Sequence, residues 1–307
     1  MANEVSSQFQ RTIEEGENRL SRSLPSLLAT GAVGGIDVGV GVFALLLVKE
    51  STHNELLAGL AFSIGFIALT LANSELFTEN FLVPIVAVTT RRARPSAVLR
   101  LWLGTAATNL VGGWMIMAVV MAAVPKLHET AVEAATHYTE LGLGWESFAS
   151  AILGGAVITL MTWMERGSKA EGGRLVAAVV AAFLLGAGKL THAIVVSLLL
   201  FAGLQAGAPY GYLDWLGFLG WATLGNMVGG IGLITVLRLV QVGKASVSPQ
   251  SDTGSPGAMA SGEGASGDGS AAEGNAAEGN ADGSAAEKTE SGPNTQSSEE
   301  ANLQRSP

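Results

Sequence analysis

The chain has 307 residues, of which 48% are apolar and 14% charged, and its mean hydropathy is +0.38. Together with 40 glycines, this composition favours a membrane protein with several spans over a soluble domain. Residues 246–307 carry eight of the nine net negative charges, so the remainder is nearly neutral and offers no basic surface for nucleic acid. The absence of cysteine excludes disulfides, thiolate metal sites and cysteine nucleophiles.

Residues 1–24 are predicted to form an amphipathic helix that lies at the membrane surface. Phe9, Ile13, Leu20 and Leu24 recur at roughly helical spacing among charged side chains. The segment is too polar to be a signal peptide of the usual form. Pro25, which follows, suits the start of a first span.

Six spans are predicted within a channel domain of residues 25–245. They fall at about 25–48, 56–90, 98–124, 148–164, 175–203 and 216–239, and glycines at every fourth position of the first span (Gly31, Gly35 and Gly39) suit close helix packing. If both termini are cytoplasmic, the cytoplasmic segments collect most bases: Arg11, Arg19, Arg22, Arg91, Arg92, Arg94, Arg100, Arg166, Lys169, Arg174, Arg238 and Lys244. The outside then receives Lys49 and Lys126, so the positive-inside rule predicts a multi-pass protein of the cell (inner) membrane with both termini inside.

A polar stretch, Asn73-Ser74-Glu75-Leu76-Phe77-Thr78-Glu79-Asn80, interrupts the second predicted span. Its carboxylates, amides and hydroxyls find no hydrogen-bond partners in lipid, so the stretch must be packed in protein or line a watery cavity. The alternative is an ordinary loop between two helices. However, the apolar run that follows, residues 81–88, is far shorter than the roughly 20 residues needed to span a bilayer. A broken helix is therefore predicted.

The fifth predicted span is interrupted in the same way, at residues 186–192. Gly186 and Gly188 alone are explained by helix packing, but Lys189 and His192 beside them indicate a functional site. The second and fifth spans are the middle spans of two three-span halves with opposite orientations. This pattern predicts an inverted repeat whose two interruptions meet at the membrane midplane.

Residues 246–307 are rich in serine, glycine, alanine and glutamate and include a near-repeat at 272–280. This acidic tail cannot bury enough apolar surface to order itself, so disorder is predicted.

The sequence at four places resembles the formate/nitrite transporter family. The matching pieces are Leu76-Phe77-Thr78 after an acidic residue, Trp163-Met164 at the end of the fourth span, residues 188–192, and Gly225-Asn226-Met227-Val228-Gly229-Gly230. The four pieces occur in the right order on six spans, and the resemblance extends over about residues 24–242. The resemblance implies an all-α, aquaporin-like fold, a homopentamer in the lipid bilayer with one pore in each protomer, transport of small monovalent anions such as formate, nitrite or hydrosulfide, and no cofactor.

The same resemblance implies roles for individual residues. Leu76, Phe77 and Thr78 look like the loop that gates the cytoplasmic constriction, and Asn226 looks like the polar partner of the threonine. His192 resembles the central histidine, which could lend a proton so that a neutral weak acid passes. Phe62 and Phe66 resemble apolar pore-facing side chains, one near each constriction, with Leu185 as the outer residue of the fifth span. A packed His192, and lipid-facing or core positions for the two phenylalanines, are the alternatives.

The sequence departs from the family pattern mainly in charge. Glu79 follows Thr78 where neutral residues are typical, and Val196 stands where an asparagine is expected. Asp37, Glu75 and Glu79 are three carboxylates within predicted spans, set against Lys189. If they face the pathway they oppose anions and favour a cation such as ammonium; alternatively Glu79 is paired with Lys189 or bonded to loop amides, away from the pathway.

Two other classes are less well supported. An intramembrane enzyme needs a nucleophile with a base or a metal cluster, and the sequence shows no such grouping. A structural anchor does not need paired helix breaks with ionisable residues. A channel rather than an enzyme is therefore predicted.

Overall fold

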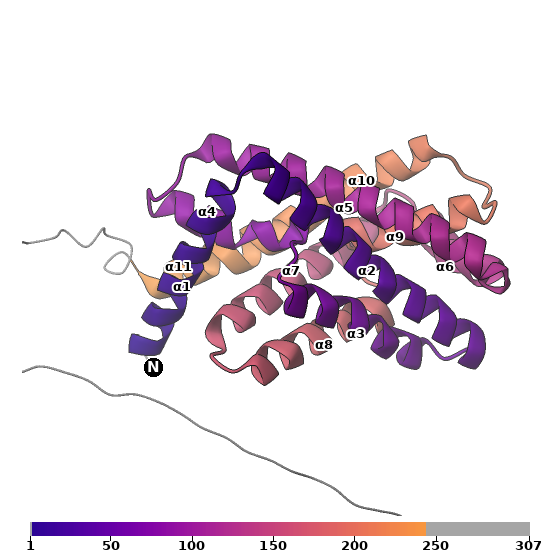
Figure 1. The fold of residues 1–307 in the computed structure, drawn as a ribbon, viewed down its shortest axis with the longest axis horizontal. Coiled ribbons are helices and arrows are strands. Elements are labelled where there is room, and N and C mark those ends of the chain that lie inside the picture. The colour runs from indigo at the N-terminus through magenta and orange to yellow at the C-terminus, as the bar shows by residue number, and fades with distance from the viewer. Residues whose placement is uncertain (1, 244–307) are drawn as a thin grey trace, which may run out of the picture. The chain divides into compact units, whose positions relative to one another are not determined.

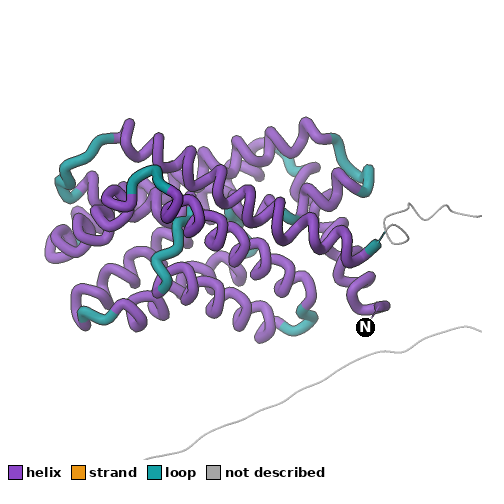
Figure 2. Tube along the Cα trace, turned by 180° about the vertical axis from the view of Figure 1, so that it is seen from behind, coloured by secondary structure: helices purple, strands orange, loops and turns teal. Residues whose placement is uncertain are grey.

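The computed structural model describes residues 2–243, and the tail predicted to be disordered, residues 246–307, lies outside these residues. Helices and short connections account for the described part, and no strand occurs in it. Figure 1 shows the helices, and Figure 2 shows loop backbone in the middle of the helix array as well as at the helix ends. The elements are α1 (Ala2–Ser21), α2 (Leu24–Thr52), α3 (Glu55–Ala72), η1 (Phe77–Phe81), α4 (Val83–Thr89), α5 (Pro95–Ala123), η2 (Pro125–Leu127), α6 (His128–Leu141), α7 (Trp145–Gly167), α8 (Glu171–Ala187), α9 (Ala193–Gln205), α10 (Tyr212–Met227), η3 (Val228–Thr235) and α11 (Val236–Val242).

Within residues 2–243, five helical segments are long and apolar enough to cross a membrane: α2, α3, α5, α7 and the continuous run from α10 to α11. The fifth predicted span is divided into α8 and α9, of 17 and 13 residues. The second span is divided as well, into α3 and the short helices η1 and α4. Both predicted interruptions are therefore present.

At both breaks a residue with left-handed backbone conformation follows the end of a helix. Asn73 ends α3 with φ of 51°, and Lys189 follows the end of α8 with φ of 47°. Left-handed backbone stops a right-handed helix, and asparagine tolerates it better than lysine does. Lys189 is therefore a strained position at the second break, where the chain turns back into the protein instead of continuing the helix.

The helix α1 is amphipathic as predicted, but its apolar face contacts protein. Phe9 and Ile13 are buried in a cluster with Val83 and Val86 of α4 and with Trp163 of α7. Figure 1 shows α1, α4 and α11 together at one end of the described part. The prediction of a helix lying on the membrane surface missed this docking, because a helical stripe of apolar residues does not reveal whether lipid or protein covers it.

The glycines of the first span bring α2 close to α5 inside a single protomer. A Cβ atom on Gly35 would lie 2.1 Å from the carbonyl oxygen of Asn109, a distance that no side chain allows. On another face of α2, Gly41 meets α3 at the carbonyl of Phe62 in the same way. The stripe therefore lets backbones approach within the fold.

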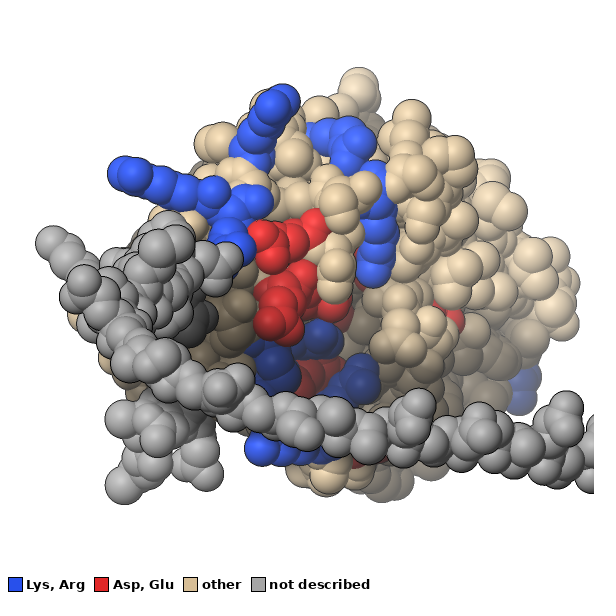
Figure 3. Space-filling model, turned by 60° about the vertical axis from the view of Figure 1, so that its left-hand side comes forward, with Lys and Arg blue, Asp and Glu red and all other residues tan. Residues whose placement is uncertain are grey.

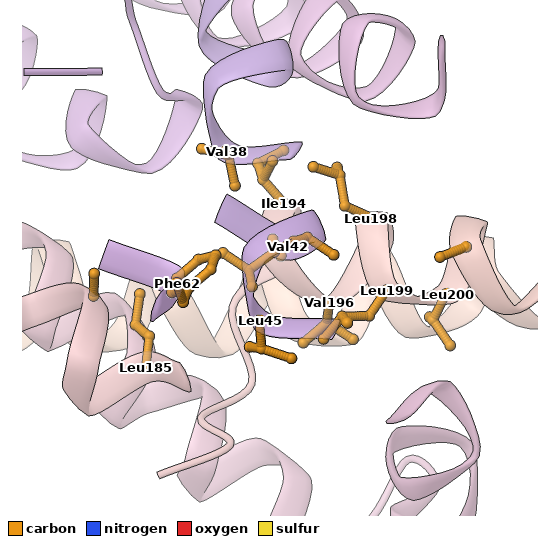
Figure 4. Packing of buried hydrophobic residues seen from close by; sticks show 14 of the residues in the cluster. Val38, Val42, Leu45, Phe62, Leu185, Ile194, Val196, Leu198, Leu199 and Leu200 are labelled. Carbon is orange, nitrogen blue, oxygen red and sulfur yellow. The ribbon is translucent and has the colours of Figure 1, made fainter. Parts of the chain in front are cut away.

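The centre of the apolar core is α9. Its residues from Ala193 to Gly203 are all buried, so this helix is enclosed by protein rather than lipid. Figure 4 shows its side chains Ile194, Val196 and Leu199 packed towards Val42 and Leu45 of α2 and near Phe62. A helix that is apolar all round is expected in such a position.

Candidate functional site

The first interruption is held by one buried side chain, Asn109 of α5. Its Nδ2 donates to the carbonyl oxygens of Gly31 (2.6 Å) and Glu75 (2.9 Å), and its Oδ1 accepts from the backbone N–H of Phe77 (2.8 Å). The amide thus satisfies backbone groups that the broken helix leaves free. The loop at residues 75–77 is fixed to α2 and α5 through this residue.

The second interruption is held in the same way by Asn226 of α10. Its Nδ2 donates to the carbonyl oxygens of Ala151 (2.7 Å) and Thr191 (2.9 Å), and its Oδ1 accepts from the N–H of Ala193 (2.8 Å). The resemblance implied that Asn226 is the polar partner of Thr78, but both N–H groups and the carbonyl oxygen of this side chain bind backbone, and Thr78 contacts His192 instead. Asn226 therefore fixes the loop at residues 191–193 through hydrogen bonds to its backbone.

These matching hydrogen bonds show which residues of the two halves of the chain are equivalent. Glu75 and Thr191 take the same place, as do Phe77 and Ala193, so His192 corresponds to Leu76 of the first half. The inverted repeat is therefore visible in individual hydrogen bonds. Sequence reasoning overlooked Asn109, although Asn-x-Val-Gly-Gly at residues 109–113 repeats at 226–230 and is a signal that identifies it.

His192 and Thr78 meet where the two interruptions come together. The Oγ1 of Thr78 lies 2.6 Å from Nε2 of His192, and both residues are completely buried. On its other side the ring accepts the backbone N–H of Val195 at Nδ1 (3.3 Å), so His192 also caps the start of α9. Since Nδ1 is an acceptor, the hydrogen of the neutral ring is assigned to Nε2, which donates a hydrogen bond to Oγ1 of the threonine.

Phe62 and Phe66 lie on α3 one turn apart and are completely buried, which excludes lipid-facing positions. Their ring centroids are 5.4 Å apart in an edge-to-face arrangement. They therefore contact each other, whereas the sequence predicted one at each constriction. Leu185, the predicted outer residue of the fifth span, lies close to Phe62 (Figure 4).

At the end of the molecule where α1 docks, acidic side chains gather in a hollow with basic side chains around them (Figure 3). Arg19 of α1 is at the centre of this group: Nε is 2.9 Å from Glu15, Nη1 is 3.0 Å from Oδ1 of Asn80, and Nη2 is 3.1 Å from Glu79. Glu75 lies 3.8 Å from Arg19 and pairs more closely with Arg22, at 2.5 Å. Of the alternatives left open by the sequence, a pair between Glu79 and Lys189 is not formed, because Glu79 binds Arg19 and Lys189 binds Glu55.

A cavity of about 130 Å³ opens beside this group. Its walls are mostly charged or polar and are formed by Glu15, Arg19, Arg22, Leu69, Thr70, Asn73, Ser74, Glu79, Glu165, Arg166 and Arg174. Burial raises the pKa of Glu15, but the charges of Arg19 and Arg166 outweigh burial, and the net shift of that pKa is downward. The carboxylate of Glu15 therefore stays ionised against the two arginines.

Lys189 lies at a different group of charges, on the side of α3 where that helix begins. Its Nζ is 3.0 Å from Glu55, which also binds Lys49 at 3.0 Å, and Lys49 reaches Glu133 of α6 at 3.2 Å. A small cavity of about 20 Å³ lies between these lysines, His137 and apolar side chains. Burial, and then the positive charges of Lys189 and Lys49, lower the pKa of His137.

Asp37 is placed apart from Glu79. It accepts a hydrogen bond from the hydroxyl of Ser74 (2.6 Å) and is half-buried on α2. This bond ties α2 to the start of the first interruption. Of the three carboxylates predicted within spans, Glu75 and Glu79 therefore lie together at Arg19, and Asp37 supports the loop nearby.

The arrangement of interrupted helices that meet at a buried polar pair defines a class of membrane transport proteins. The chain belongs to the formate/nitrite transporter family, whose model matches residues 6–240. It is 25% identical over 246 residues to inner membrane protein YfdC of Escherichia coli, covering 75% of this chain and 76% of YfdC. It is 23% identical to formate channel BtFdhC of Bacillus thuringiensis, over 72% of this chain and 89% of the relative.

Solved structures show the same fold. A structure described as an FNT family ion channel superposes with a TM-score of 0.65 at 17% identity, over 75% of this chain and 96% of the other. A pentameric formate channel with formate bound gives 0.59 at 19% identity, over 71% and 97%. The recognition of the family from sequence is confirmed, as is the all-α membrane fold with broken second and fifth spans.

Proposed function

We propose that this protein is a channel for small monovalent anions of the formate and nitrite class, or for their conjugate acids, with one pathway through each protomer. The observation that carries the proposal is the buried pair of His192 and Thr78 at the meeting point of two helix breaks. We take the pathway to run from the charged cavity at Arg19, past this pair, to the lysine group at Glu55. A pathway in this direction passes two charged mouths and one polar centre.

The physical difficulty for such a channel is the loss of anion hydration in the apolar centre. A bare carboxylate there costs many kcal/mol unless it is ligated or neutralised. His192 supplies a hydrogen-bond donor at Nε2, and the N-terminus of α9 adds a partial positive charge at the same place. His192 can transfer a proton only after it has gained one at Nδ1, which breaks the hydrogen bond from the N–H of Val195. In the arrangement described, the ring is neutral and therefore donates a hydrogen bond without transferring the proton.

One observation favours the second candidate, a channel selective for ammonium. Oε1 of Glu79 is buried and has no hydrogen-bond partner among the described residues, and the side chain lines the cavity. A free carboxylate oxygen is a ligand for a cation that can donate hydrogen bonds. Against this, Arg19 binds the other oxygen of Glu79 and offsets the charge.

For assembly and orientation we propose six spans, a homopentamer in the cell (inner) membrane, and both termini in the cytoplasm. The pentamer is supported by the described assembly of a fold relative, the pentameric formate channel, and the membrane by the relative YfdC. The distribution of arginines at the end where α1 docks supports a cytoplasmic position for that end. The mass of the purified protein in nanodiscs should correspond to five copies, and a stable monomer or trimer would contradict the assembly.

Reversal potentials in liposomes test the transported species. With the full-length protein and gradients of formate, nitrite, chloride, ammonium and sodium, the wild type should follow formate and nitrite. His192→Ala should abolish this flux or its pH dependence, whereas Ser197→Ala should preserve it, because Ser197 is buried on the same helix but bonds only the carbonyl of Ala193. Wild-type currents that follow ammonium and ignore formate would establish the second candidate instead.

A further inference from the structure

Arg19 is a charged residue that lies outside every predicted span and is nevertheless buried, with 4% of its surface exposed. It reaches the first interruption from α1, and its guanidinium contacts groups of that segment and of its own helix through all three nitrogens. Burial alone lowers the pKa of Arg19, but Glu75, Glu79 and Glu15 outweigh burial and raise it, so the side chain is cationic.

The carboxylates at Arg19 flank the short segment that ends in Thr78 of the central pair. Glu75 immediately precedes Leu76-Phe77-Thr78, and Glu79 immediately follows it. Among the described residues, Glu79 has Arg19 as its basic partner, while Glu75 has Arg22 as well. The electrostatic potential beside Thr78 therefore depends on a charge that α1 supplies.

The form of the side chain also matters. Nε, Nη1 and Nη2 point to Glu15, Asn80 and Glu79, three acceptors in different directions. A planar guanidinium can satisfy them together, whereas the single ammonium of a lysine cannot reach all three. Arginine at this position both neutralises the acids and fixes the segment from Glu75 to Asn80.

We propose that Arg19 of α1 determines the charge selectivity of this mouth of the channel. With α1 docked, its guanidinium offsets Glu75 and Glu79 and lets an anion approach Thr78 and His192. Without that charge Glu79 lines the cavity with no basic side chain bound to it, Glu75 keeps only Arg22, and the mouth attracts cations. The inference rests on the proposed function only in placing the pathway through the cavity beside Glu79.

The test is the ratio of formate to ammonium permeability, obtained from reversal potentials of the full-length protein in liposomes. Arg19→Gln should lower this ratio about tenfold or more, the smallest effect expected of a charge that focuses ions at a cleft. Arg92→Gln is the matched control, because it removes one positive charge from an exposed position after α4 and should leave the ratio unchanged.

Two further variants separate charge from folding. Glu79→Gln leaves Arg19 in excess and should raise the ratio, and it does so without removing a basic side chain from the core. The double variant Arg19→Gln/Glu79→Gln should return the ratio to within about threefold of wild type, because the local charge is balanced again. An incorrectly folded protein would not regain its selectivity through a second substitution.

The results for selectivity and for substrate are distinguishable. If the wild type conducts ammonium alone, the proposed substrate is wrong. Even then, Arg19→Gln must increase and Glu79→Gln must decrease the ammonium permeability relative to that of the wild type, measured with sucrose balancing the osmolarity. The inference is overturned if Arg19→Gln and Glu79→Gln leave the ratio unchanged or shift it in the same direction. A wild type that passes neither ion overturns both.

Discussion

Replacing Asn109 with alanine should remove the support of the first interruption. Asn109→Ala leaves the carbonyls of Gly31 and Glu75 and the N–H of Phe77 without their partner. If each bond has the average worth of an interhelical bond in a membrane, about 0.6 kcal/mol, the loss is about 2 kcal/mol. If all three groups stay unsatisfied, at about 1–3 kcal/mol each, it is about 3–9 kcal/mol. Since Asn109 is completely buried, we expect a loss of at least about 3 kcal/mol.

The assay is unfolding in mixed micelles, followed by the fluorescence of the six tryptophans. Asn109→Asp should be no better than alanine, because a carboxylate oxygen replaces the amide nitrogen and faces two carbonyl oxygens. Thr108→Ala is the control: its hydroxyl bonds only the backbone of its own helix, at Gly104 and Thr105. A loss of stability below about 1 kcal/mol for Asn109→Ala would refute the supporting role of Asn109 at the first interruption, since this is less than the contribution of one typical hydrogen bond.

Three further outcomes are expected. Gly155→Val should prevent folding, measured as loss of the monodisperse peak in size exclusion, because even a Cβ at Gly155 would lie 2.1 Å from the carbonyl of Asn226. In NMR, His137 should titrate below the ordinary range of a histidine, because burial and then Lys189 lower its pKa, and Lys189→Gln should move that pKa upward. Deleting residues 246–307 should leave folding and flux nearly intact; a large loss of flux would contradict the sequence-based prediction for the tail.

The sequence by itself determined the class of protein, the positions of both helix breaks and the family. Composition and apolar run length decide these features, because a bilayer admits few ways to bury backbone and because a polar stretch such as residues 73–80 cannot face lipid. His192 was singled out for the same reason, as an ionisable residue inside a span. Asn109 was also within reach, since the repeat of Asn-x-Val-Gly-Gly at 109–113 and 226–230 needs no coordinates to be seen.

Only the tertiary structure decided which charged and polar groups meet. Glu79 is paired with Arg19, 60 residues earlier in the chain, and Thr78 with His192, 114 residues later. No periodicity encodes such pairs, because a side chain finds its partner through the packing of helices that are distant in sequence. The docking of α1 on α4 illustrates this best. The sequence predicted the apolar stripe of Phe9 and Ile13, but it did not predict which residues pack against that stripe. That docking brings Arg19 to the interruption, so the charge beside the central pair is a property of the folded chain.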